Sequence, residues 1–394
     1  NEIPTLSLED ARERGLLRPV DNVITERYLR TIEQLSRHSQ PRSDLRIVYT
    51  PMHGVGLATA MEALKRAGFD QVVPVASQAA PNGEFPTVHF PNPEEPGAMD
   101  LAFATAKETG ADLILANDPD ADRLAVAVPN RDGDGFLQLS GNQVGVLLAH
   151  YYLAYDPSPP KDRLFVTTIV SSPMLGAMAR QEGARYEETL TGFKWIANRA
   201  MQVEADTGTT FIAGYEEALG YTIGTAVRDK DGVSAVAVFA EMTAYLRSQG
   251  RSILDELELM YRKYGLYVSR QVSRWHRGLD GAQRIQQIMA KLRAAPPSRL
   301  EDFDVVAVRD YQQQLRTQRD GTRTTLDLPK SNVLSFELEG GSRIVARPSG
   351  TEPKIKFYFD HREVMHPEES LPSAEKRANE RLDRLVNAFL QAAE

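Results

Sequence analysis

The sequence predicts an α/β protein, with successive α/β domains containing mixed or parallel sheets, followed by a C-terminal α+β domain. Two observations lead to this prediction. Short β-rich runs alternate with helical stretches from residue 45 to about residue 264, and a strand–helix–strand succession is typical of parallel sheets. From about residue 275, strand patterns dominate until a helix closes the chain. The 394 residues are enough for several domains.

The first half of the chain divides into a lead-in and one α/β domain. Residues 1–44 hold a polar stretch and a predicted helix over 21–38, with Asp21 as its candidate cap. This segment has no predicted sheet of its own and is interpreted as the end of a preceding unit. Residues 45–157 are expected to form the second domain. Its predicted elements are strands at 45–50, 71–77 and 111–117, helices at 58–68 and ending at Gly110, and a hairpin over 125–140.

The second half repeats the α/β rhythm and then changes. Residues 158–272 are predicted to form a third domain and residues 273–394 a smaller α+β domain. The third domain has predicted strands at 163–172, 184–190 and 209–217, helices at 173–183 and 192–205, and two more helices between 232 and 264. The last domain has predicted strands at 303–311, 333–340 and 343–348 and a closing helix over 373–392.

Composition excludes several classes of function. The chain has no cysteine, so disulfides, thiolate catalysis and zinc–sulfur sites are excluded, and a reducing cytoplasmic location is expected. We expect no membrane association, because the sequence has no long apolar run and no signal pattern. The net charge of −8 argues against nucleic-acid binding. A small anionic substrate remains compatible, since it needs only local positive charge.

Three aspartates alternate in residues 117–124, NDPDADRL, which we call the aspartate loop. The loop follows a predicted buried strand, where open α/β sheets bind ligands. In extended backbone, Asp118, Asp120 and Asp122 point the same way and can converge on one divalent cation. Oxygen ligands and open coordination positions suit Mg²⁺. Arg123 follows directly. The alternative interpretation is a solvated acidic turn.

Two further loops also follow predicted strands. The segment 191-TGFK-194 places Gly192 at a strand-to-helix turn and adds the cation of Lys194. Residues 215–220, YEEALG, which we call the sugar loop, offer the strong acceptors Glu216 and Glu217 for sugar hydroxyls. An ordinary turn remains the alternative for both segments. Lys230 lies in 228-RDKDG-232, for which a solvated loop is the alternative.

The segment 347-RPSGTEPK-354, which we call the phosphate loop, has the composition of an anion site. Arg347 offers a guanidinium fork, Ser349 and Thr351 offer hydroxyls, and Gly350 lets backbone N–H groups face a phosphate. The spacing is not that of a Walker A loop. A second glycine pattern, 54-GVGLAT-59, is interpreted as a close strand–helix turn, because the third glycine of a dinucleotide fingerprint is missing.

Taken together, these loops resemble the α-D-phosphohexomutase superfamily, which includes phosphoglucomutases and phosphomannomutases. The resemblance covers roughly residues 20–360 and rests on five motifs in family order: TPMHGVG (50–56), DPDADR (118–123), TGFK (191–194), YEEALG (215–220) and RPSGT (347–351). It implies a four-domain enzyme in which a phosphoserine of the first domain phosphorylates a sugar phosphate. The sugar 1,6-bisphosphate then turns round and returns its other phosphoryl group to the serine.

The resemblance also implies roles for the loops. Asp118, Asp120 and Asp122 resemble the Mg²⁺ ligands, and Arg123 resembles the arginine beside them. Lys230 resembles a cleft lysine near the reacting groups. The remaining implied contacts are with the small phosphosugar substrate: Gly192, Lys194, Glu216 and Glu217 for the sugar, and Arg347, Ser349, Gly350 and Thr351 for the distal phosphate.

The sequence departs from the family pattern at one essential point. It contains no serine loop of the T-A-S-H-N-P kind, so the resemblance implies that the chain lacks nearly all of the first domain and that residues 1–44 are the C-terminal remnant of that domain plus a linker. We therefore expect it to be inactive as a mutase by itself and to bind Mg²⁺ weakly. Two alternatives remain open: a phosphopentomutase of the same superfamily, and a non-catalytic sugar-phosphate-binding protein.

Overall fold

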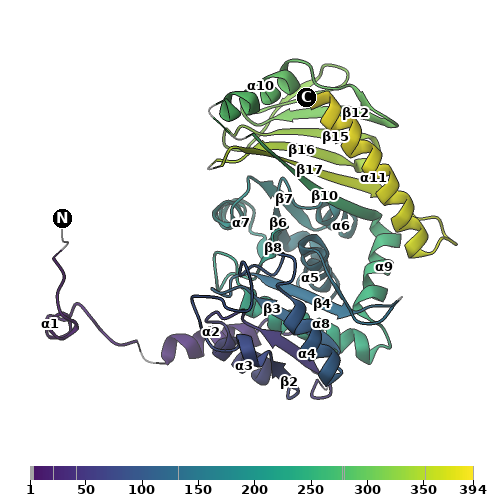
Figure 1. Cartoon of the computed structure of the whole chain (residues 1–394). Coiled ribbons are helices and arrows are strands. Elements are labelled where there is room, and N and C mark those ends of the chain that lie inside the picture. Colours follow the sequence, from purple (N-terminus) through teal and green to yellow (C-terminus); the bar gives the residue numbers. More distant parts are fainter. Residues whose placement is uncertain are drawn as a thin grey trace.

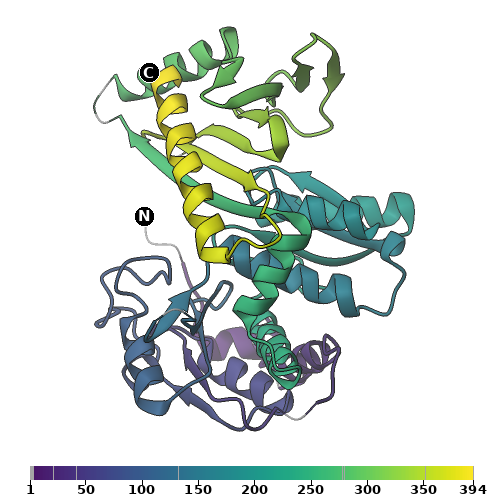
Figure 2. The same ribbon diagram turned by 90° about the vertical axis from the view of Figure 1, so that its right-hand side faces the viewer.

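The described residues of the computed structural model form three β-sheets with flanking helices (Figure 1). In Figures 1 and 2 the sheets follow one another in chain order from the bottom of the molecule to the top. Residues 4–20, 22–40, 42–131, 133–276, 278, 280–350 and 352–393 are described. Among these residues, no helix combines the length and the apolar character that crossing a membrane requires. The predicted α/β architecture with a C-terminal α+β part is confirmed.

The first sheet has the order β2-β1-β3-β4-β5. Its strands are β1 (Ile47–Thr50), β2 (Val72–Pro74), β3 (Leu113–Asn117), β4 (Leu124–Pro129) and β5 (Phe136–Gln138), with α3 (Leu57–Arg66) and α4 (Asp100–Thr109) between them. The first three strands are parallel, and β4 and β5 form the predicted hairpin. The carboxyl end of β3 leads directly into the aspartate loop, so the sheet positions that loop at a buried edge.

The second sheet has the order β7-β6-β8-β9. Its elements are β6 (Arg163–Thr168), β7 (Arg185–Thr189), β8 (Thr210–Glu216), β9 (Gly220–Ile223), α5 (Gly141–Tyr155), α6 (Met174–Glu182) and α7 (Phe193–Thr207). The strand predicted over 163–172 ends at Thr168. Helix α5, which was not predicted, begins with a capping box formed by Ser140 and Gln143 and packs on β8.

Helix α8 (Gly232–Ser248) joins the first two sheets. It follows the second sheet in the sequence, yet it packs against α3 and β3 of the first unit and against β9 of the second. The helix is apolar on nearly all sides because both units cover it. One continuous hydrophobic core therefore runs through both units. Helix α9 (Ile253–Tyr264) leads from α8 to the last sheet.

The C-terminal sheet is antiparallel, in the order β10-β17-β16-β15-β12-β13-β14, and has a core of its own. Its elements are β10 (Leu266–Trp275), β11 (Arg299–Leu300), β12 (Phe303–Asp310), β13 (Leu315–Gln318), β14 (Arg323–Thr325), β15 (Leu334–Leu338), β16 (Arg343–Pro348), β17 (Lys354–Glu363), α10 (Gly281–Ala294) and α11 (Leu371–Ala393). Strand β10 pairs with β17 along its whole length. It therefore crosses the boundary predicted between residues 272 and 273.

In the described part of the N-terminal segment, two helices precede the first sheet. Helix α1 (Leu8–Glu13) was not predicted, and none of its six residues is buried. The helix predicted over 21–38 is α2 (Val23–Glu33), which ends earlier than expected and packs on α3. Its candidate cap Asp21 lies outside the described residues. Within the described residues there are also three short 3₁₀ helices, at Ala76–Gln78, Pro160–Asp162 and Glu339–Gly341.

Candidate functional site

The aspartate loop gathers its three carboxylates as predicted. One oxygen each of Asp118, Asp120 and Asp122 lies within 4.8 Å of the others. The loop turns between them at Ala121, which has a φ of 59°. Burial, together with the charge of Asp118, raises the pKa of Asp120. A cation at this point would relieve the repulsion between the carboxylates.

Two basic side chains already contact these carboxylates. Arg123 donates to both oxygens of Asp118, from its backbone N–H at 3.0 Å and from Nε at 2.6 Å. The Nζ of Lys230 lies 2.9 Å from Oδ2 of Asp122. Both cations predicted to take part in the site are therefore at the aspartate loop. A further hydrogen bond, from Arg123 Nη1 to the side-chain oxygen of Asn92 at 3.1 Å, orients the guanidinium.

The donor set fits Mg²⁺. Three carboxylate oxygens are hard ligands, and an octahedral ion held by three of them would keep coordination positions for water and other oxygen ligands. When bound, the ion would neutralise phosphate charge.

The backbone of the aspartate loop packs closely against neighbouring glycines. A Cβ on Gly54 would lie 2.2 Å from the carbonyl oxygen of Pro119, and one on Gly56 would lie 2.8 Å from Cβ of Ala121. Both glycines belong to TPMHGVG, between β1 and α3, where the sequence predicted a close strand–helix turn. A Cβ on Gly232 would meet the carbonyl oxygen of Arg123 at 2.4 Å. These glycines allow two other segments to set the position of the loop.

The aspartate loop and the sugar loop are joined through the backbone. The N–H of Leu124 donates to the carbonyl oxygen of Leu219 at 3.0 Å, and Arg123 forms a β-bridge with Gly220. Lys230 packs at the same junction, since a Cβ on Gly220 would lie 2.6 Å from its Cδ. Its Nζ also lies 5.5 Å from the centre of the Phe193 ring. Lys230 thus lies at the junction of the aspartate loop and the sugar loop.

The two glutamates of the sugar loop have different environments. Glu216 accepts a hydrogen bond of 2.5 Å from the backbone N–H of Gly192, whose φ is 116°. Burial raises the pKa of Glu216, against the charges of Lys230 and Arg347. Burial raises the pKa of Glu217 to about 7, although the hydroxyl of Ser171 donates to its carboxylate at 3.1 Å.

Lys194 is less closely tied to the sugar loop. Its Nζ lies 5.5 Å from the centre of the ring of its neighbour Trp195, and the side chain is exposed. The structure therefore joins Gly192 to Glu216 by a hydrogen bond but gives Lys194 a contact with Trp195.

The phosphate loop connects β16 to β17. The backbone N–H of Ser349 donates to the carbonyl oxygen of Lys354 at 2.9 Å, and the hydroxyl of Ser349 accepts from the N–H of Glu352 at 3.2 Å. Arg347 acts on the sugar loop through its charge, which lowers the pKa of Glu216 against the effect of burial. Gly350 is part of the turn, and Thr351 lies outside the described residues.

One cation beside the phosphate loop, Lys356, was not predicted from the sequence. Lys356 pairs with Arg347 across the β16–β17 hairpin, so the two side chains share a face of the sheet. Burial, together with the charges of Lys354 and Arg347, lowers the pKa of Lys356. The signal was present in the sequence, because predicting the hairpin 343–363 would have placed these residues opposite each other.

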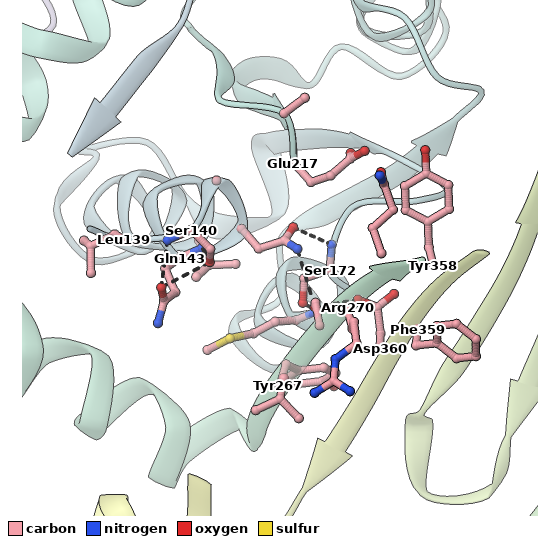
Figure 3. A pocket seen from close by; sticks show the side chains of 18 of the residues that line it. Leu139, Ser140, Gln143, Ser172, Glu217, Tyr267, Arg270, Tyr358, Phe359 and Asp360 are labelled. Carbon is pink, nitrogen blue, oxygen red and sulfur yellow. Dashed lines mark hydrogen bonds between the residues drawn. The ribbon is translucent and has the colours of Figure 1, made fainter. Parts of the chain in front are cut away.

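A large cavity lies beside these loops. It has a volume of about 870 Å³ and is lined by residues of the sugar loop, α5, β10 and β17 (Figure 3). Figure 3 shows Glu217 and Tyr358 at the cavity, and Lys356 also lines it. The cavity is thus bounded by the sugar loop on one side and by the strand that follows the phosphate loop on the other.

Comparisons with known proteins agree with this architecture. Residues 26–133 match the family model described as phosphoglucomutase/phosphomannomutase, alpha/beta/alpha domain II, and residues 140–264 match domain III of the same family. The first match begins inside α2, before residue 45, where the sequence predicted the second domain to begin. The limits of the domains stay a prediction.

Several relatives carry mutase names. The chain is 41% identical to a probable phosphomannomutase of Haemophilus influenzae over 344 residues, which are 87% of this chain and 65% of that protein. It is 36% identical to a phosphoglucomutase of Staphylococcus aureus, with 87% of this chain and 61% of that protein covered. The chain thus spans less than two thirds of the length of these relatives.

Solved structures share the fold. A phosphoglucomutase/phosphomannomutase family protein from Burkholderia thailandensis superposes with a TM-score of 0.61 at 19% identity, covering 94% of this chain and 64% of that one. Parafusin, a phosphoglucomutase from Paramecium, gives a TM-score of 0.61 at 18% identity, with 92% and 62% covered. The fold and the matched domains are those of sugar-phosphate mutases. The chain belongs to the phosphoglucomutase/phosphomannomutase family.

Proposed function

We propose that this chain carries the metal, sugar and phosphate loops of a phosphohexomutase, which interconverts sugar 1-phosphates and sugar 6-phosphates. The observation that carries the proposal is the junction of the aspartate and sugar loops, where Lys230 contacts Asp122 and packs against Gly220. A phosphoryl group at the aspartates would therefore lie next to the acceptors for a sugar ring. The names of the relatives support a phosphosugar as the substrate.

Each loop has a role in this mechanism. Asp118, Asp120 and Asp122 would hold Mg²⁺, which neutralises the charge of the phosphoryl group in transfer. Arg123 and Lys230 are the catalytic cations beside it, because phosphoryl transfer depends mainly on positioning and on charge stabilisation.

The other two loops would orient the substrate. Glu216 and Glu217, together with Lys194 and with Gly192, whose N–H donates to Glu216, would contact the sugar hydroxyls, for which a carboxylate is a strong acceptor. Arg347, Ser349, Gly350 and Thr351 would bind the distal phosphate, the one that is not being transferred. Lys356 adds a further cation on the same face as Arg347.

In the full reaction the phosphoryl donor would be a phosphoserine, with sugar 1,6-bisphosphate as intermediate and activator. The sequence contains no serine loop of the family kind, so the 394-residue chain is expected to bind ligands without turning them over. The comparison with relatives supports this expectation, because the chain covers only 65% and 61% of the lengths of the two mutases it was compared with.

Calorimetric titration of the purified chain with glucose 1,6-bisphosphate in the presence of Mg²⁺ tests the proposal. We expect saturable binding that Arg347→Ala weakens, because the distal phosphate loses its guanidinium partner. Ribose 1-phosphate, titrated in the same way, separates a hexose site from a pentose site. If neither sugar phosphate binds, the proposed function is contradicted. Efficient mutase turnover by this chain would contradict the expected inactivity.

A further inference from the structure

Ser171 lies between the sugar loop and the C-terminal sheet. It follows β6 and is fully buried. Its hydroxyl donates to Oε2 of Glu217 at 3.1 Å, and the hydroxyl of Thr168 lies 2.9 Å from the same Oγ. Its backbone carbonyl accepts a hydrogen bond from the guanidinium of Arg343. One small residue therefore contacts both a sugar-loop carboxylate and a strand of another sheet.

The guanidinium of Arg343 is held firmly. Its side chain is 8% exposed, and its Nη2 lies 2.7 Å from Oδ2 of Asp360. Its Nη1 lies 3.2 Å from Oε1 of Glu188, which belongs to β7 of the second sheet. A buried guanidinium with such partners moves only together with its strand. That strand is β16, which leads into the phosphate loop at Arg347.

We propose that Ser171 is a positioning residue that links the sugar loop to the phosphate loop. Its hydroxyl holds the carboxylate of Glu217, and its backbone carbonyl accepts a hydrogen bond from Arg343 of β16, so that the position of the hydroxyl depends on β16. The link rests on the proposed function, because it assumes that the Glu217 carboxylate accepts hydrogen bonds from the sugar. Docking of a phosphate at the phosphate loop would then stabilise the sugar-binding geometry of Glu217, and the reverse coupling follows by linkage.

The surroundings of Glu217 make this link measurable. The charges that face Glu217 are the carboxylates of Glu216 and Asp360 and the ammonium of Lys356, and Tyr358 lies close to it. Burial and the two carboxylates raise the pKa of Glu217, whereas the hydroxyl of Ser171 lowers it. Loss of this hydroxyl should therefore raise that pKa further, so that the carboxylate forms only at higher pH.

Titration of the chain with glucose 6-phosphate across neutral pH tests the first half of the link. Ser171→Ala should weaken binding roughly tenfold near neutral pH, the usual effect of losing one hydrogen bond to a charged group, and less at alkaline pH. Ser171→Thr, which keeps the hydroxyl, should restore the affinity. Ser335→Ala removes another buried serine hydroxyl, on β15, and is the matched control. Unchanged affinity of Ser171→Ala at every pH would overturn the proposal.

A ligand-free measurement separates the link from the proposed function. The infrared band of the protonated carboxyl of Glu217, identified by its loss in Glu217→Gln, should disappear at a higher pH in Ser171→Ala than in the unchanged chain. If no variant binds glucose 6-phosphate, the proposed function fails while this midpoint still tests the positioning of Glu217. An unshifted midpoint would overturn the positioning role even if the sugar phosphate binds.

The second half of the link is tested through Arg343. Arg343→Lys keeps the charge and loses the guanidinium fork, and circular dichroism checks that the variant folds. If Arg343 acts through Ser171, Arg343→Lys weakens glucose 6-phosphate binding when it is the single substitution, but causes no further loss when it is added to Ser171→Ala. Independent losses that simply add would show that Arg343 does not act through Ser171, and would overturn this half of the proposal.

Discussion

The ammonium of Lys230 lies 2.9 Å from the carboxylate of Asp122, while its alkyl stem packs where Gly220 leaves room for it. Burial lowers the pKa of Lys230, but the carboxylates of Asp122 and Asp229 outweigh burial and hold that pKa above its usual value. The ammonium is therefore charged at neutral pH and available to both the aspartate loop and the sugar loop.

Lys230→Gln should change two affinities in opposite directions. Sugar-phosphate binding should weaken by about tenfold, because a charged partner is lost. Mg²⁺ binding should strengthen, because Asp122 no longer carries a competing cation. Calorimetric titration with each ligand measures both effects, and Lys161→Gln, at an exposed lysine outside these loops, is the control. Weaker Mg²⁺ binding in Lys230→Gln would contradict the idea that Lys230 competes with Mg²⁺ for the carboxylate of Asp122.

Asp120→Asn should lower the affinity for Mg²⁺ by at least about tenfold, because one of three charged ligands becomes neutral. Without Mg²⁺ the same variant should melt at a higher temperature than the unchanged chain, since the carboxylate of Asp118 no longer repels its neighbour. Thermal melts with and without Mg²⁺ test both effects, with Asp134→Asn on the exposed hairpin as control. Melting temperatures that fall in both conditions would indicate a purely structural role.

Glu217 should give the chain a stability that depends on pH. Its pKa is about 7 in the folded chain and near 4.5 when unfolded, so the folded state binds the extra proton between these values. Its contribution to the free energy of unfolding is therefore full below about pH 4.5 and is lost as the pH rises towards 7, by about 1.4 kcal/mol per pKa unit. Urea unfolding at several pH values should show this slope, and Glu217→Gln should remove it.

Gly54→Ala should displace the aspartate loop, because its Cβ would lie 2.2 Å from the carbonyl oxygen of Pro119. We expect weaker Mg²⁺ binding and a free energy of unfolding lower by about 1–3 kcal/mol, the usual cost of an overpacked site. Gly83→Ala is the matched control, since nothing lies within 4 Å of its added Cβ. Equal behaviour of the two variants would show that the loop adapts without strain.

Lys356→Gln should weaken the binding of inorganic phosphate as well as that of sugar phosphates, because Lys356 and Arg347 share one face of the β16–β17 hairpin. The comparison with Arg347→Gln by calorimetry shows whether the two cations act on the same phosphate. Lys376→Gln, on the exposed side of α11, is the control. Phosphate binding that is lost in Arg347→Gln and unchanged in Lys356→Gln would place Lys356 outside the phosphate site.

The sequence predicted the elements that have short-range signals. The aspartate loop was recognisable because alternating carboxylates after an apolar strand converge within five residues. Helix α5 was missed because it is apolar on most sides and lacks a clear stripe. The contact between Lys230 and Asp122 joins positions far apart in the chain, and the packing of α8 brings them together. Such contacts depend on tertiary structure and have no signature in local spacing.

The position of α8 has a practical consequence for dissecting the molecule. A fragment that ended near residue 157 would contain all five strands of the first sheet but not α8, and the apolar surface of β3 and β4 on which α8 packs would be open to water. A fragment that began after residue 157 would contain α8 without α3 and β3, against which α8 packs. The two α/β units are therefore interlocked, and we expect them to be inherited, expressed and exchanged between relatives as one piece.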